Sequence, residues 1–92
     1  MFIDVIDWDD EDDPDGNLWH IIGTGEVTRD EVEELLYNPE SKREKSRESG
    51  NPMVVGWTST GKHIAVIFTF EDDPDLVIVR PKTAYPVPEY GG

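Results

Sequence analysis

The chain has 92 residues, which suits one small domain with a modest hydrophobic core. Hydrophobic residues make up 36% of it, too many for a disordered chain, and the absence of cysteine excludes disulfides and thiolate metal sites. No apolar run approaches the length of a membrane span, and the first ten residues are too acidic for a signal peptide. We therefore expect a cytoplasmic protein that does not contact membranes.

The net charge is −13, but acidic and basic residues are separated along the chain. Residues 1–40 hold fourteen acids and one base, whereas residues 41–70 hold five bases and two acids. An acidic chain repels nucleic acid unless the fold gathers its bases on one surface. Charge alone therefore favours a basic protein partner, or simply solubility.

The first part of the chain predicts a strand followed by a short helix. In FIDVIDW, Phe2, Asp4, Ile6 and Trp8 share one side and Ile3, Val5 and Asp7 the other, which favours a strand over residues 2–7. The acidic pentapeptide EDDPD follows at 11–15 and occurs again at 71–75. In the first copy Asp13 suits a helix N-cap and the proline after it suits the first turn, so we expect a helix over about 14–22.

The segment VTRDEVEELLYNP, residues 27–39, predicts a second helix. Thr28 suits the N-cap, and Glu31 stands three residues later, where it completes a capping box. We expect Asn38 to end the helix in a left-handed cap, because the proline that follows cannot continue it.

The second half of the chain predicts three strands. The polar segment ESKREKSRESGNP has no apolar anchor, so we expect residues 40–52 to form a mobile loop. HIAVIFTF is apolar on much of both faces, as expected of a central strand. The expected strands are 53–59, 63–70 and 76–80, and the prolines beyond them predict an extended C-terminal tail over about 83–92.

The predicted order is β-α-α-β-β-β in one domain over residues 1–92, an α+β fold with two helices on one face of an antiparallel sheet. Five motifs accompany this order: Trp8-Asp9, Asn-x-x-His at 17–20, Val-Thr-x-x-Glu-Val-Glu-Glu at 27–34, VVGWTSTGKHIAVIF at 54–68 and PKTAY at 81–85. In order and spacing they resemble the BrnT family of toxins, from bacterial type II toxin–antitoxin pairs, which have a compact RelE-like fold.

The resemblance implies a ribonuclease that needs no metal or other cofactor, and a cognate antitoxin that covers its site and binds DNA. Such an enzyme needs a base for the ribose 2′-OH, an acid for the leaving 5′-oxygen and cations for the phosphate. The chain departs from the family at Trp57, where the family has arginine, at Thr24-Gly25-Glu26, where it often has His-Gly, and in its acidity. We therefore expect a diverged member, weakly active or non-catalytic.

Four residues are the catalytic candidates. Arg80 and Lys82 flank a proline and lie on one side of an extended chain, where both can meet one phosphate; cations on an edge strand can equally serve only to prevent aggregation. His20 and His63 carry imidazole rings, which suit proton transfer. Alternatively, His20 is an ordinary helix histidine and His63 follows a surface turn.

Six further residues are candidates for binding RNA or a protein partner. A basic belt can grip RNA or an acidic antitoxin, or form a solvated loop interleaved with glutamates. Trp57 can stack on a base or pack in an interface, and Lys62 can supply a cation or lie in solvent at a turn. The belt consists of Lys42, Arg43, Lys45 and Arg47.

The acidic pentapeptides do not predict a specific metal site. An EF-hand loop starting at Glu11 lacks the bidentate glutamate at its twelfth position, where Ile22 stands, and the second copy has Leu76 in place of the glycine. Weak attraction of Ca²⁺ or Mg²⁺ stays open. Two rivals to the ribonuclease remain: a non-catalytic domain that binds a protein through its sheet edge or basic loop, and an acidic Ca²⁺ buffer. The oligomeric state is undetermined.

Overall fold

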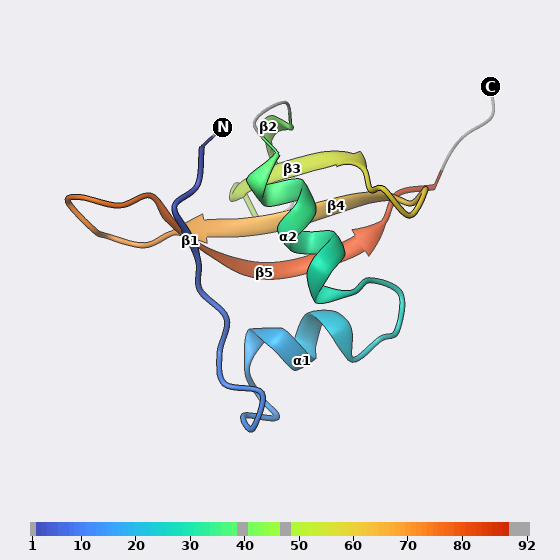
Figure 1. The fold of residues 1–92 in the computed structure, drawn as a ribbon, viewed down its shortest axis with the longest axis horizontal. Coiled ribbons are helices and arrows are strands. Elements are labelled where there is room, and N and C mark those ends of the chain that lie inside the picture. Colours follow the sequence, from blue (N-terminus) through green and yellow to red (C-terminus); the bar gives the residue numbers. More distant parts are fainter. Residues whose placement is uncertain (1, 39–40, 47–48, 89–92) are drawn as a thin grey trace.

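The computed structural model describes residues 2–38, 41–46 and 49–88. It has two helices and a five-stranded sheet with the strand order β1-β5-β4-β3-β2 (Figure 1). The mixed α+β class is therefore confirmed, with one strand more than predicted. The elements are β1 (Val5–Ile6), α1 (Asn17–Ile22), α2 (Arg29–Tyr37), β2 (Lys42–Lys45), β3 (Pro52–Trp57), β4 (His63–Phe70) and β5 (Ile78–Pro86).

The hydrophobic core lies between the helices and one face of the sheet. On the central strand β4, Ile64, Val66 and Phe68 alternate with residues of the other face and are fully buried. In Figure 1, α2 crosses this face over β3 and β4, and α1 runs beside β5. The helices add Ile21, Val32, Leu35 and Leu36 to the core, and the neighbouring strands add Val54, Val79 and Ala84.

The start of α2 is confirmed as a capping box. The Thr28 hydroxyl accepts from the Glu31 N–H at 3.2 Å, and the Glu31 carboxylate accepts from the Thr28 N–H at 2.9 Å. The predicted end is wrong in its geometry. Asn38 is the C-cap, but its φ is −73°, so the helix ends by turning into extended backbone and not through a left-handed residue.

The first helix begins later than the sequence predicts. Its N-cap is Gly16 and not Asp13, and no side chain of the N-cap residue closes it. Asp13 instead accepts from the N–H of Asp15 at 3.0 Å, a local turn that leaves the helix start to a more distant carboxylate. A Cβ added at Gly16 would lie 2.6 Å from that of Asp9, so this approach requires glycine.

The segment predicted as a loop over 40–52 contains an edge strand. β2 pairs antiparallel with β3, and Ser46 and Asn51 close the hairpin through a 2.8 Å backbone hydrogen bond. Gly50 provides the turn with φ of 73°. Sequence polarity was misleading here, because an edge strand is held by backbone pairing and its side chains can stay in solvent.

The two outer strands on the other side also differ from prediction. β1 is shorter than the expected 2–7 and pairs with β5 in parallel, so the sheet is mixed and not purely antiparallel. β5 extends through Pro86, so residues 83–86 belong to the sheet and not to a tail. Pro81 fits inside β5 because β1 pairs only with residues 78 and 79, and Pro81 therefore needs no N–H for a neighbouring strand.

Candidate functional site

Arg80 is the most strongly held cation of the chain. Its guanidinium donates two parallel hydrogen bonds to the Asp9 carboxylate, at 2.8 and 2.5 Å, and lies 3.6 Å from a carboxylate oxygen of Asp7. The Asp9 hydrogen bonds raise the pKa of Arg80. The same hydrogen bonds, followed by one from the backbone of Asn17, lower the pKa of Asp9 to about 2. Arg80 therefore begins as half of an ion pair and not as a free phosphate ligand.

Asn17 joins three distant segments beside this ion pair. Its side-chain oxygen accepts from the Asp9 N–H at 2.7 Å, and its side-chain amide donates to the carbonyls of Asp7 and Pro81, both at 3.0 Å. Its own N–H donates to the Asp9 carboxylate at 2.9 Å, so Asp9 closes the start of α1. The side chain is buried and every polar atom is used. In the sequence, Asn17 stood out only as the first residue of the Asn-x-x-His motif, and no structural role was predicted for it.

Lys82 lies close to this network without a partner of its own. It is the unpaired residue of a bulge in β5, opposite the register shift between Ile67 and Phe68. Its side chain is exposed, and among the described carboxylates none lies within ion-pair distance. Its charge helps lower the pKa of Asp9, so Arg80 and Lys82 stand near one carboxylate. Their two-residue spacing predicted that they would share a side of the strand.

The structure separates the two histidines. His20 is exposed on α1, one turn beyond Asn17, and α1 runs alongside β5 in the same direction (Figure 1). A turn advances roughly 5 Å along a helix, which carries His20 in the direction of Lys82. His63 lies at the far end of β4, six positions before Thr69, the partner of Arg80, which is roughly 20 Å at strand spacing. One site cannot use both His63 and Arg80.

His63 instead stacks on Trp57. The two rings lie 4.7 Å apart and 14° from parallel, on strand positions that face each other across β3 and β4. The outer face of Trp57 is free, since 55% of the residue is exposed. His63 Nδ1 is buried and has no hydrogen-bond partner in the described part of the chain. A 310 Å³ hollow adjoins the pair, between Lys62 and the end of β5.

Lys62 has a structural contact that the sequence did not predict. Its ammonium donates to the Glu31 carboxylate at 3.2 Å and to the carbonyl of Glu26 at 3.1 Å. Glu31 is 3% exposed and also accepts from the Thr60 hydroxyl at 2.6 Å. Burial raises the pKa of Glu31, but hydrogen bonds from Thr60, Thr28 and Lys62 outweigh it, and the pKa falls to about 2.

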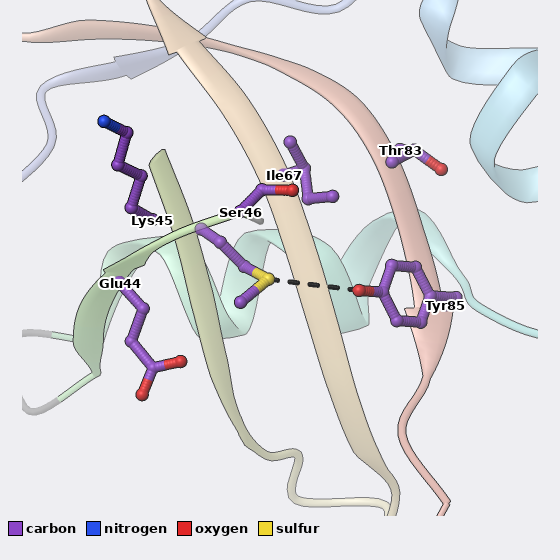
Figure 2. A pocket seen from close by; sticks show the side chains of 7 residues that line it. Glu44, Lys45, Ser46, Ile67, Thr83 and Tyr85 are labelled. Carbon is purple, nitrogen blue, oxygen red and sulfur yellow. Dashed lines mark hydrogen bonds between the residues drawn. The ribbon is translucent and has the colours of Figure 1, made fainter. Parts of the chain in front are cut away.

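Neither helix of the described residues covers the face of the sheet opposite α2, here called the uncovered face, and the centre of this face carries no acid. The strands β3, β4 and β5 contain no aspartate or glutamate, although 21 of the 92 residues are acidic. Figure 2 shows this face, with α2 behind the strands. A hollow of about 630 Å³ opens here, and its lining includes Met53, Ile67 and Thr83. The Tyr85 hydroxyl donates to the Met53 sulfur, at 3.9 Å.

Three residues of the basic belt, Lys42, Arg43 and Lys45, lie in the edge strand β2. Arg43 lies over the ring of Phe70, 5.4 Å from its centroid, and Lys45 is exposed. Lys42 contributes its backbone to the strand, and Arg47 lies outside the described residues. Cations are thus concentrated at two places, β2 and the N-terminal end of β5, which lies beside α1.

The acidic pentapeptides form turns. Asp10, just before the first copy, and Asp13, within it, accept from backbone N–H groups two residues later, and Asp73 accepts from Asp75 and Leu76 in the second copy. Within residues 2–38, 41–46 and 49–88, no three histidine or carboxylate side chains converge so as to hold a metal ion. In the same parts of the chain, neither helix is long and apolar enough to cross a membrane.

Comparisons of the chain with protein-family models, with curated proteins and with solved structures give no match.

Proposed function

We propose that this protein is a BrnT-like toxin-family protein of a type II toxin–antitoxin pair, with a RelE-like fold and a weak, metal-independent ribonuclease activity. One observation carries the proposal. The motifs behind the resemblance meet in two hydrogen-bond networks: Asp9, Asn17 and Pro81 in one, Thr28, Glu31 and Thr60 in the other. Motifs that jointly hold a fold support common descent better than motifs that merely recur in the same order.

The end of β5 beside α1 is the site that best fits cleavage. Lys82 and Arg80 supply positive charge for the phosphate, and His20 is the nearer histidine for proton transfer from the ribose 2′-OH. The reaction joins the 2′-oxygen to phosphorus and releases the 5′-oxygen, which takes a proton. We expect a low rate, because phosphate has to compete with Asp9 for Arg80.

A digest of single-stranded RNA by the purified protein in EDTA tests the proposal. We expect fragments ending in a 2′,3′-cyclic phosphate, and no cleavage of the same sequence with 2′-O-methyl groups, which lack the attacking hydroxyl. Lys82→Ala and His20→Ala should lower the rate at least tenfold, whereas His63→Ala should leave it nearly unchanged. Cleavage that persists equally in Lys82→Ala and His20→Ala would remove this site, and intact RNA would remove the activity.

The second candidate is a non-catalytic domain that holds a protein partner. The exposed edge strand β2, with basic side chains on an acidic protein, is the observation that favours it. It predicts co-purification of a partner together with intact RNA in the digest. A cognate antitoxin, expected to cover the cationic end of β5, is the partner implied by the first proposal.

A further inference from the structure

We propose that the free edge of β2 binds an extended acidic segment of another protein chain, which adds to the sheet as a sixth strand. This inference does not rest on ribonuclease activity. In the part of the chain that the structure describes, β2 is the outermost strand and pairs with β3 alone, so one side of its backbone has no neighbouring strand there. Addition of a strand to such an edge uses main-chain hydrogen bonds for affinity and alternate side chains for specificity.

The backbone groups of Arg43 and Lys45 point to the free side. Ser46 donates its N–H inward, to the carbonyl of Asn51, and this direction alternates along a strand. Lys45 lies opposite Pro52, which has no N–H and therefore suits a pair without hydrogen bonds. It follows that the N–H and carbonyl groups of Arg43 and Lys45 are placed to pair with an added strand.

The charge of this edge selects against a second copy of the chain. Arg43 and Lys45 are exposed and lie opposite Val54 and Pro52, on the helix side of the sheet. A two-fold pairing of β2 with β2 would place these cations against each other, because both subunits present the same surface. An acidic strand from a different protein is the complementary occupant.

A hollow lies on each face of the sheet beside β2. The 630 Å³ hollow of the uncovered face is lined mainly by the sheet residues Met53, Ile67 and Tyr85 (Figure 2), and a 240 Å³ hollow on the helix side is lined by Arg43 and Phe70. Glu44 and Lys45 of β2 border both hollows. Side chains of an added strand alternate between the two faces. The fitting segment therefore alternates apolar residues, directed to the uncovered face, with acidic residues, directed to the two cations.

Fluorescence anisotropy with labelled hexapeptides tests the partner chemistry. A peptide of alternating glutamate and valine should bind, and more weakly as salt rises. Two controls are alternating lysine and valine, and the first peptide rearranged as three glutamates followed by three valines. Both should bind at least tenfold more weakly. Equal binding of either control, or no binding of the alternating acidic peptide, would overturn the proposal.

A matched pair of variants tests the geometry. Arg43→Ala removes the charge but keeps the N–H, and should weaken binding about threefold. Arg43→Pro also removes the outward N–H, at a position where an edge strand tolerates proline, and should weaken binding about tenfold more. Lys82→Ala, which removes an exposed cation on β5, should leave peptide affinity unchanged.

Equal affinity of Arg43→Ala and Arg43→Pro would exclude strand addition, provided both variants melt like the parent. N-methylation of alternate residues of the peptide tests the same backbone hydrogen bonds between peptide and β2. This experiment uses the unchanged protein, so it does not depend on how a variant folds. Methylation of one set of alternate residues should abolish binding, and methylation of the other set should not. Unchanged affinity with both methylated peptides would exclude the added strand.

Discussion

Asp9 and Glu31 perform similar tasks in different surroundings. Asp9 accepts from Arg80 and Asn17 and joins the chain before α1 to β5, and its side chain is one-quarter exposed. Glu31 accepts from Thr60 and Lys62 and joins α2 to the turn between β3 and β4, almost out of contact with water. Each carboxylate closes a helix start and collects donors from a distant segment.

The two carboxylates differ in whether water can replace their hydrogen bonds once these are lost. Water can reach the Asp9 carboxylate if its pairing with Arg80 is lost, whereas the Glu31 carboxylate is 3% exposed and would stay buried without its donors, although Thr60 and Lys62 themselves reach solvent. We infer that the Glu31 network stabilises the fold more, and that the Asp9 network is the easier one for a ligand to open. Arg80 can therefore leave its carboxylate for a ligand at a lower cost in stability than Lys62, because Asp9 is open to water and Glu31 is not.

The largest expected effect is that of Glu31→Ala. It removes the acceptor for the Thr28 N–H, the Thr60 hydroxyl and the Lys62 ammonium, and should lower the free energy of unfolding by about 3 kcal/mol. Glu34→Ala is the matched control: Glu34 lies on the same helix and accepts from the backbone and side chain of Ser59, but in an exposed position.

For Glu34→Ala we expect about 1 kcal/mol or less. Urea denaturation followed by circular dichroism measures both variants. Equal losses would show that the burial of Glu31 does not matter to its contribution.

Asn17→Ala should have the next largest effect. It leaves the Asp9 N–H and two carbonyls without a side-chain partner, which should cost about 2 kcal/mol in the same denaturation experiment. Asn17→Asp keeps the size but loses both donated bonds and adds a charge beside Asp9, so it should be the more damaging change. A stable Asn17→Asp protein would contradict the hydrogen bonds assigned to the amide.

Sequence reasoning succeeded where a pattern is local and failed where it depends on distant partners. The capping box of α2 and the alternation of β4 are contained in short segments, and both are present as predicted. The start of α1 was misplaced because Asp13 is a good cap by type, whereas the carboxylate that bonds the helix start belongs to Asp9. No pattern of neighbouring residues predicts that Asp9 is the partner of the helix start.

The two EDDPD copies make the same point. Identical residues form a loop before a helix in one place and a hairpin connection in the other, because the flanking segments decide the path. The candidate site was predicted only residue by residue. The spacing of Arg80 and Lys82 placed them together, but nothing in the sequence separated His63 from them or tied Lys62 to Glu31.

Acid should weaken both networks in a defined range. The folded pKa of Asp9 and of Glu31 is about 2, below the ordinary 3.8 and 4.5, so the unfolded chain binds protons first. Their contribution is complete above about pH 5 and is lost as pH falls toward 2. Stability measured from pH 7 down to pH 3 should therefore fall, and less steeply in Glu31→Ala than in the parent. Parallel slopes would contradict the depressed pKa of Glu31.

The smallest expected effect has the opposite sign. Glu71 lies beside Asp7, and hydrogen bonding to that carboxyl, together with burial, raises the pKa of Glu71. For an acid with a raised pKa, the folded protein binds the proton more tightly, so this contribution to stability declines as pH rises.

Glu71→Gln removes one of two adjacent negative charges and should raise the melting temperature slightly at pH 7. The gain should vanish at pH 3, where Glu71 is protonated in the parent. A gain in melting temperature that persists at pH 3 would have to come from packing and not from charge. The clustered carboxylates around Arg80 would then not affect the stability of the fold.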